Sequence, residues 1–306
     1  MDELFSKNGK LISKNDWENR IKELKPEQEL EYSEEKIARD VKKLFEEAVK
    51  IRVENVDQIG IMFSGGLDSS LIAAICKKQK VNFTCYTVGF QDGNFKEPDD
   101  VVAAKEIAKH LKLSPDEFKF KLFSIKEIEP IIKRVARILK DISECNNSDI
   151  QTVVSVEVGS VEAAAYSISQ KEQIFFSGLG SEEIFAGYDR HRKNPTNEEC
   201  FRGLLNMYDR DLLRDSAIPK ALGFNFTTPF LDKELIQYSL AIPIKYKIND
   251  EGSKMVLRKA AMSYLGKFSE RPKKAAQYGS SLDKAIAKLA LIHKSRYKKD
   301  YIRSLQ

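Results

Sequence analysis

Apolar side chains recur along most of the chain at the intervals that distinguish helices from strands. Residues 34–53 follow Ser33, a favourable N-cap, and carry apolar side chains every three or four positions. We therefore expect an amphipathic helix that packs on a sheet. Similar patterns predict further helices at 71–80, 99–111 and 125–139 and, after a polar break at 144–149, a long alanine-rich helix that leads into residue 173.

Four short runs between these helices are rich in β-branched and aromatic residues and predict strands. They lie at residues 58–63, 82–90, 117–123 and 173–178. Strands that alternate with helices of this length form βαβ units. We therefore expect an α/β fold, a doubly wound parallel sheet with helices on both faces.

The pattern divides the chain into three parts. Residues 1–32 are polar with little periodicity, so we expect a loosely structured N-terminal arm. Residues 33–197 hold the alternating strands and helices of the α/β domain. Residues 198–306 are mainly helical, so we expect the sheet to end before them and the helices to cover one end of it.

Composition places the chain among globular proteins, because 42% of its 306 residues are apolar and no segment is of low complexity. No run approaches the ~18 apolar residues of a membrane span, and no leader is visible, so we expect a soluble cytoplasmic protein without a membrane partner. The four cysteines form no C-x-x-C pair and the three histidines lie far apart. This spacing argues against a disulfide framework, a zinc site and a Ser/His triad.

Positive charge is concentrated near the C-terminus. Residues 266–306 contain eleven Lys and Arg against three Asp and Glu, whereas the whole chain carries a net charge of +5. Such a segment faces an anionic ligand, a nucleic acid or water, and the sequence leaves these alternatives open.

The segment SGGLDSS at 64–70 joins a predicted strand to a predicted helix. Parallel sheets bind ligands beyond the carboxyl ends of their strands, and a glycine-rich turn before a helix N-terminus favours anions. Asp68 places a negative charge in this anion site, which is explained if a divalent metal lies between it and phosphates. The spacing excludes the Walker A loop and the G-x-G-x-x-G loop, and the remaining alternative is a turn without a ligand.

A second Gly-rich segment, FFSGLGSEEIFAGYDRHRK at 175–193, also follows a predicted strand. Its glycines Gly178 and Gly180 allow the backbone to pass close to a nucleotide. Glu182 and Glu183 offer further carboxylates for a metal. We expect this segment to lie on the same edge of the sheet as Asp68.

These segments resemble motifs of a known enzyme superfamily and of one family within it. SGGLDSS resembles the pyrophosphate loop of the N-type ATP pyrophosphatases, or PP-loop enzymes, which cleave ATP between its α and β phosphates and adenylate a substrate. The second segment resembles S-G-E-G-(S/A)-D-E-(I/V)-F-G-G-Y of the asparagine synthetase C-terminal domain. The later segments at 227–248, 254–261 and 270–280 resemble further motifs of that domain in the same order. The resemblance implies an adenine nucleotide alpha hydrolase-like fold.

The resemblance also implies roles for individual residues. The pyrophosphate of ATP would be held by Ser64, Gly65, Gly66, Asp68, Ser69 and Ser70. The rest of the nucleotide would lie against Thr87, Val88, Gly89, Ser177 and Gly178. Asp68 and Glu182 would ligate Mg²⁺, with Glu182 replacing the usual aspartate. Lys273 would act with Asp68 in catalysis by stabilising charge on the α-phosphate and the intermediate.

Two departures from the family leave the substrate open. Leu179 stands where asparagine synthetases carry the motif glutamate, and residues 149–160 lack the arginine that holds the substrate carboxylate in those enzymes. β-Lactam synthetases also lack that glutamate. No segment resembles the glutaminase domain, so we expect ammonia or an amine, free or from a separate glutaminase subunit, as the nitrogen source.

The sequence favours an ATP-dependent carbon–nitrogen ligase that adenylates a small-molecule carboxylate and forms an amide. A PP-loop enzyme that modifies tRNA, with residues 266–306 on the RNA, is a second possibility that the absence of C-x-x-C does not favour. A nucleotide-binding regulatory protein without catalysis is the third.

Overall fold

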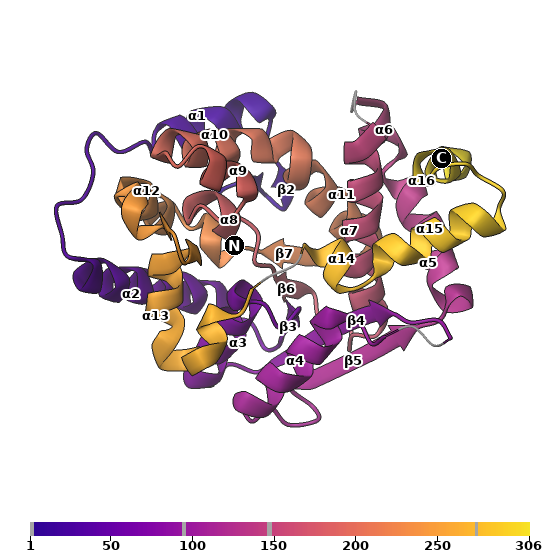
Figure 1. The fold of residues 1–306 in the computed structure, drawn as a ribbon, viewed down its shortest axis with the longest axis horizontal. Coiled ribbons are helices and arrows are strands. Elements are labelled where there is room, and N and C mark those ends of the chain that lie inside the picture. The colour runs from indigo at the N-terminus through magenta and orange to yellow at the C-terminus, as the bar shows by residue number, and fades with distance from the viewer. Residues whose placement is uncertain (1–2, 94–95, 146–148, 273–274) are drawn as a thin grey trace.

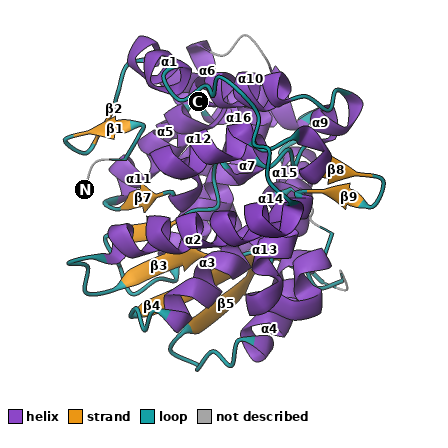
Figure 2. Ribbon diagram, turned by 90° about the vertical axis from the view of Figure 1, so that its left-hand side faces the viewer, coloured by secondary structure: helices purple, strands orange, loops and turns teal. Residues whose placement is uncertain are grey.

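A five-stranded, wholly parallel sheet forms the centre of the protein (Figures 1 and 2). The structure is a computed structural model that describes residues 3–93, 96–145, 149–272 and 275–306. The strand order is β5-β4-β3-β6-β7. The strands are β3 (Ile59–Met62), β4 (Phe83–Phe90), β5 (Phe118–Phe123), β6 (Ile174–Phe176) and β7 (Asn225–Thr227). The expected doubly wound α/β fold is confirmed, with its first four strands in the expected segments.

The chain reverses its direction of travel across the sheet at β3. From β3 it proceeds outward through β4 to β5, and it then returns to place β6 on the other side of β3. Such a reversal opens a crevice at the carboxyl ends of the two strands, which is where open α/β sheets bind ligands. The crevice of this sheet therefore lies between the loops that follow β3 and β6.

The fifth strand corrects the expectation that the sheet ends before residue 198. β7 pairs in parallel with β6 through Ile174 and Asn225, Phe175 and Phe226, and Phe176 and Thr227. It is only three residues long and lies between helices, so its sequence lacks the length that makes a strand recognisable. Its pairing with β6 comes from the tertiary structure.

Two hydrophobic cores cover the two faces of the sheet. Alternate side chains of β4 divide between them, because Phe83 and Cys85 pack in one core and Tyr86 and Val88 in the other. The first core includes residues of α2 (Glu34–Val53), α3 (Leu67–Lys78), α4 (Asp99–His110) and α13 (Met255–Leu265). The second includes residues of α5 (Ile125–Ile138), α7 (Asp149–Ser167), α11 (Leu213–Leu222), α15 (Leu282–Ile292) and α16 (Lys298–Leu305).

Shorter elements complete the described fold. The remaining α-helices are α1 (Lys14–Lys22), α6 (Lys140–Cys145), α8 (Ser181–Ile184), α9 (Asp189–Lys193), α10 (Asn197–Met207), α12 (Lys233–Ala241) and α14 (Ala276–Gly279). A π-helical turn, η1, spans Tyr208–Leu212, and 3₁₀ turns lie at Pro229–Leu231, Ile244–Tyr246 and Gly266–Glu270. Two hairpins pair β1 (Ser6–Lys7) with β2 (Lys10–Leu11) and β8 (Ile248–Asn249) with β9 (Gly252–Ser253).

The N-terminal segment differs from the expected loose arm, because residues 14–22 form helix α1. Ser13 caps this helix by accepting a hydrogen bond from the backbone N–H of Asp16. Trp17 and Ile21 are fully buried, and the Trp17 indole donates to the Leu204 carbonyl oxygen over 3.0 Å. Two buried side chains in a polar segment are too few to produce a clear helical periodicity, so only the packed structure shows the helix.

The basic C-terminal segment makes many of its ion pairs within the molecule. Acidic residues from other parts of the chain neutralise at least five of its cations. The pairs are Arg271 with Glu106, Lys288 with Asp92, Lys298 with Glu157, Lys299 with Asp149 and Arg303 with Asp149. None of the described helices combines the length and apolar character that a membrane crossing requires.

Lys247 is fully buried, and its Nζ donates to Asn197 Oδ1 over 2.8 Å. Burial lowers the pKa of Lys247 below the ordinary value. The unmodified protein, called the parent below, should therefore lose stability as the pH falls from about 10.5 toward that lowered pKa. In this range the lysine takes up a proton in the unfolded state but stays neutral in the folded state.

We expect Lys247→Met to raise the free energy of unfolding at pH 7 by about 1 kcal/mol and to have a smaller effect near pH 10. Urea unfolding of both proteins across this pH range measures the difference between their free energies of unfolding. The contributions of the other lysines are the same in both proteins and cancel in this difference. A difference that does not grow as the pH falls would contradict the lowered pKa.

Candidate active site

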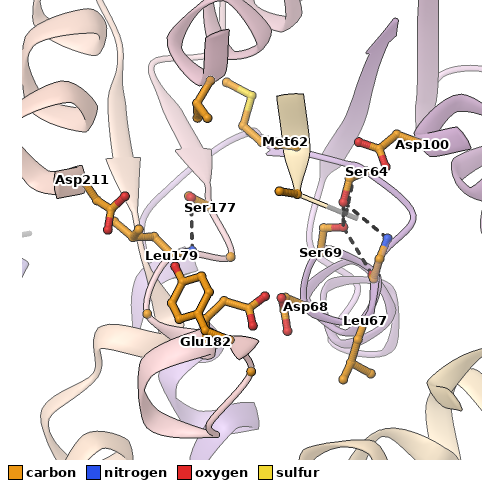
Figure 3. A pocket seen from close by; sticks show the side chains of 18 of the residues that line it. Met62, Ser64, Leu67, Asp68, Ser69, Asp100, Ser177, Leu179, Glu182 and Asp211 are labelled. Carbon is orange, nitrogen blue, oxygen red and sulfur yellow. Dashed lines mark hydrogen bonds between the residues drawn. The ribbon is translucent and has the colours of Figure 1, made fainter. Parts of the chain in front are cut away.

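The loop after β3 forms a small, donor-rich turn at the crevice (Figure 3). Gly65 has φ +69°, and a Cβ at this position would lie 2.4 Å from the Ala104 backbone nitrogen. Only glycine therefore fits this turn against α4. Gly66 is the N-cap residue of α3, so the first N–H groups of a twelve-residue helix begin at Leu67. These groups and the helix dipole favour an anion at the loop.

The serine hydroxyls of the loop hold one another in place. Ser69 Oγ accepts from the Ser64 backbone N–H and lies 3.3 Å from Ser64 Oγ, which in turn accepts from the Gly66 N–H. Ser64, Gly66, Leu67, Asp68 and Ser69 line a cavity of about 1080 Å³. Gly65 and Ser70 do not line it, although both were predicted to hold pyrophosphate. Ser70 Oγ is buried without a hydrogen-bond partner among the described residues.

The loop after β6 faces the first one across the crevice. Ser177, Gly178, Leu179, Gly180 and Glu182 all line the same cavity. A Cβ at Gly178 would stand 3.0 Å from the Asp68 Cβ, which shows how closely the two loops approach. Glu182 lies in the short helix α8, and its side chain and that of Asp68 point toward one another (Figure 3). The structure therefore brings together the two predicted metal ligands.

Lys254 connects these two carboxylates, and the sequence analysis did not identify it as a site residue. Its Nζ lies 3.0 and 2.9 Å from the Asp68 carboxylate oxygens, 2.9 Å from Glu182 Oε1 and 2.9 Å from Ser181 Oγ. Lys254 is buried and has φ +60°, a conformation uncommon for a residue with a side chain. It directly precedes α13 and is the first residue of the segment 254–261, but no periodicity distinguishes it from a surface lysine.

The carboxylate pair fits a magnesium ion in its donor set. Mg²⁺ is usually held in proteins by one or two carboxylates together with substrate phosphates, rather than by a complete cage of side chains. Asp68 and Glu182 supply two such carboxylates. Among the described residues, no group of three or more His, Cys, Asp or Glu side chains lies close enough together to hold a metal.

The end of β4, which was predicted to lie against the rest of the nucleotide, only partly lines the cavity. Met62, Tyr86, Thr87 and Val88 line it, whereas Gly89 does not. Thr87 Oγ1 donates to the Phe63 carbonyl oxygen over 2.5 Å, so its hydroxyl is engaged within the sheet. Lys273, the predicted catalytic lysine, lies outside the described residues. Its described neighbours Pro272 and Ala275 line the cavity.

A second group of charges lines the far end of the cavity, and the sequence analysis named only one of its members, Glu183, which it offered as a carboxylate for a metal. Arg210 binds Glu183, and its Nη2 lies 2.6 Å from Asp211 Oδ2. Arg214 Nε lies 2.5 Å from Asp215 Oδ1. These residues come from η1, α8 and α11, where opposite charges a few positions apart are typical of a solvated helix face. The burial of Glu183, Asp211, Arg214 and Asp215 is visible only in the folded chain.

The crevice, the Gly–Ser loop and the facing carboxylates define a parallel α/β protein with an anion-favouring loop at the switch point of its sheet. The chain belongs to the asparagine synthase family, whose model matches residues 40–205 and 192–299.

Relatives in three organisms illustrate this membership. A Methanocaldococcus jannaschii protein named as a glutamine-hydrolysing asparagine synthetase is 30% identical over 306 residues, covering 86% of this chain and 54% of that protein. The glutamine-hydrolysing asparagine synthetases of Gallus gallus and Homo sapiens are each 31% identical, with 74% and 71% of this chain aligned. The alignments span 40% and 38% of those enzymes, so the chain spans about half or less of the length of these relatives.

Solved structures also show similarity at low identity. The NH3-dependent NAD synthetase of Campylobacter jejuni is 19% identical with a TM-score of 0.33, covering 51% of this chain and 61% of that chain. The U34-tRNA thiolase of Methanococcus maripaludis is 14% identical with a TM-score of 0.40, covering 90% and 79%.

Proposed function

We propose that the chain is an ATP- and Mg²⁺-dependent ligase that adenylates a small-molecule carboxylate and transfers the acyl group to ammonia or an amine. One observation carries the proposal. The carboxylates of Asp68 and Glu182 converge on the same point, the ammonium group of Lys254, beside the loop at 64–70. Family membership supports the use of ATP.

In the first step, an oxygen of the substrate carboxylate attacks the α-phosphorus, and the bond to the bridging oxygen of the β-phosphate breaks. Acyl-AMP and pyrophosphate result. The N-terminal N–H groups of α3 and the hydroxyls of Ser64 and Ser69 would stabilise the departing pyrophosphate. Mg²⁺, held by Asp68 and Glu182, would neutralise phosphate charge when bound.

Lys254 adds a fixed positive charge to this part of the site. Its ammonium group already lies between the two carboxylates, so it can also meet a phosphate oxygen placed against them. Arg258, in helix α13 that follows Lys254, lines the cavity and donates to the carbonyl oxygens of Ser253 and Ser269 over 2.9 and 2.7 Å. It thereby connects the segments on either side of α13. By resemblance, Lys273 would stabilise charge on the α-phosphate.

In the second step, the nitrogen of ammonia or an amine attacks the carbonyl carbon, AMP leaves and the nitrogen loses a proton. Leu179 lines the cavity but cannot accept that proton. We propose that the nitrogen arrives as free ammonia, as ammonia from a separate glutaminase subunit, or as an amine.

The test is pyrophosphate release from ATP and Mg²⁺ with ammonia and a panel of amino acids and other carboxylates. We expect at least one carboxylate to stimulate release in the parent and Asp68→Asn to reduce that rate at least tenfold, because one charged oxygen ligand is lost. Asp92→Asn, a carboxylate paired with Lys288 outside the cavity, is the control.

Equal rates in parent and Asp68→Asn would overturn the assignment of the metal site, and release that no carboxylate stimulates would contradict the adenylation step. No release with any carboxylate would favour a nucleotide-binding protein without ligase activity.

A further inference from the structure

The far end of the cavity contains a buried carboxyl group that the proposed mechanism does not use. Glu162 lies in α7, lines the cavity and exposes 8% of its surface. Its near neighbours along α7 that line the same cavity are apolar, namely Val158, Val161 and Ala165. The polar contacts of Glu162 therefore come from the facing helix α11 and the turn before it.

These contacts leave one oxygen of Glu162 unsatisfied. Glu162 Oε1 lies 3.6 Å from Arg214 Nε, which is engaged at 2.5 Å with Asp215. Glu162 Oε2 is buried and has no hydrogen-bond partner among the described residues. Buried polar atoms in proteins nearly always have a partner, so an unpartnered oxygen beside a cavity indicates a missing donor.

The surrounding charges indicate which kind of donor fits. The carboxyl groups at this end of the cavity are Glu162, Glu183, Asp211 and Asp215, whereas the guanidinium groups bound among them are Arg210 and Arg214. Arg190 is farther from them, 3.7 Å from Glu183, and is shared with Glu199. The excess of carboxyl groups attracts a cation and repels an anion.

The state of the Glu162 carboxyl agrees with this interpretation. Burial and the nearby Asp215 carboxylate, to which Glu162 is hydrogen-bonded, raise the pKa of Glu162 well above its ordinary value, whereas Arg214 opposes them and Asp211 adds a smaller effect in the same direction as Asp215. A cation beside Oε2 would compensate this repulsion and favour the ionised carboxylate. A primary ammonium group suits this position, because its three N–H donors can supply the hydrogen bond that Oε2 lacks while its charge offsets the neighbouring carboxylates.

We propose that Glu162 binds a primary ammonium group of a substrate, with Arg214, itself held by Asp215, positioning the Glu162 carboxylate. This inference rests on the proposed function, because a ligase of this kind uses two substrates that can carry such a group. The ammonium belongs either to the carboxylate that is adenylated or to the ammonia or amine that attacks the acyl-AMP.

Kinetics of the two half-reactions distinguish these sources. The parent is compared with Glu162→Gln and with a control, Glu157→Gln, whose carboxyl is also buried in α7 but pairs with Lys298 outside the cavity. ATP–pyrophosphate exchange is measured with amino acids and with the same acids lacking the amino group, and amide formation with ammonium chloride and methylamine. We expect Glu162→Gln to raise KM about tenfold or more for the amino acid in exchange, or for the amine in amide formation.

A direct binding measurement separates failure of this inference from failure of the proposed function. Rb⁺ resembles ammonium in size and gives an anomalous X-ray signal, so crystals of the full chain are soaked in rubidium chloride. We expect a peak beside Glu162 Oε2 in the parent and in Glu157→Gln, and none in Glu162→Gln.

The absence of this peak in the parent, or KM values in Glu162→Gln equal to those of the parent in both half-reactions, overturns the ammonium site. A parent that shows the peak but activates no carboxylate retains the ammonium site and contradicts the ligase. Thermal melts of the three proteins show whether each variant is folded.

Discussion

Replacing Lys254 by methionine is expected to destabilise the protein by about 3 kcal/mol in the absence of Mg²⁺ and to abolish substrate-dependent pyrophosphate release. The methionine keeps most of the volume of the side chain but removes the ammonium group between Asp68 and Glu182. Buried Asp68 and half-buried Glu182 then lose the ammonium group that they share, and losing one partner of a buried ion pair costs about 3–5 kcal/mol.

Mg²⁺ should recover part of this loss, because a divalent cation at the two carboxylates replaces the missing charge. Urea unfolding with and without Mg²⁺ measures the recovery. Lys259→Met is the matched control, since Lys259 lies in α13, five positions after Lys254, but pairs with Glu34 and Glu35 at the surface. If Mg²⁺ recovers none of the stability lost in Lys254→Met, the metal does not bind at Asp68 and Glu182.

Gly65→Ala is expected to weaken ATP binding by a factor of a hundred or more and to destabilise the fold by about 3 kcal/mol. The left-handed backbone of Gly65 alone costs an alanine about 1–2 kcal/mol. The added Cβ also meets the backbone of Ala104 at 2.4 Å, so the loop or α4 must move. A shifted loop misaligns the N–H groups of α3 with the phosphates.

Gly9→Ala separates the two causes, because Gly9 has the same φ of +69° and nothing within 4 Å of an added Cβ. It should show the conformational cost without the loss of ATP binding. Urea unfolding and equilibrium binding of a non-hydrolysable ATP analogue measure both effects. Normal affinity in a folded Gly65→Ala protein would mean that this loop does not bind the nucleotide.

The α/β domain was largely predictable because its signals are local. The strands at 59–62 and 83–90 are nearly continuous apolar runs, as expected for strands buried on both faces, and each is followed by a helix with an apolar stripe. The segments that escaped prediction lack such signals. Helix α1 is held by a few buried side chains, and β7 is three residues long and defined by its pairing with β6.

The candidate site also contains residues that the sequence predicted and residues that it did not. Asp68 and Glu182 were found because each follows a Gly-rich turn at the end of a predicted strand, and parallel strands bring such turns to one edge. Lys254 reaches the same place from 186 positions farther along the chain than Asp68, in an unusual backbone conformation that no sequence pattern indicates. Its role depends on the packing of α13 against α2 and α3.

The sequence by itself determined the parallel α/β fold, the Gly–Ser loop and the two carboxylates that face it, since these follow from periodicity and from residues adjacent in the chain. Only the tertiary structure decided that Lys254 lies between the carboxylates and that Glu162, Arg214 and Asp215 form a buried charged end of the cavity. Charged side chains in a helix look the same in sequence whether they face water or a cavity. Burial by distant segments distinguishes the two, because it removes the water that would otherwise solvate each charge.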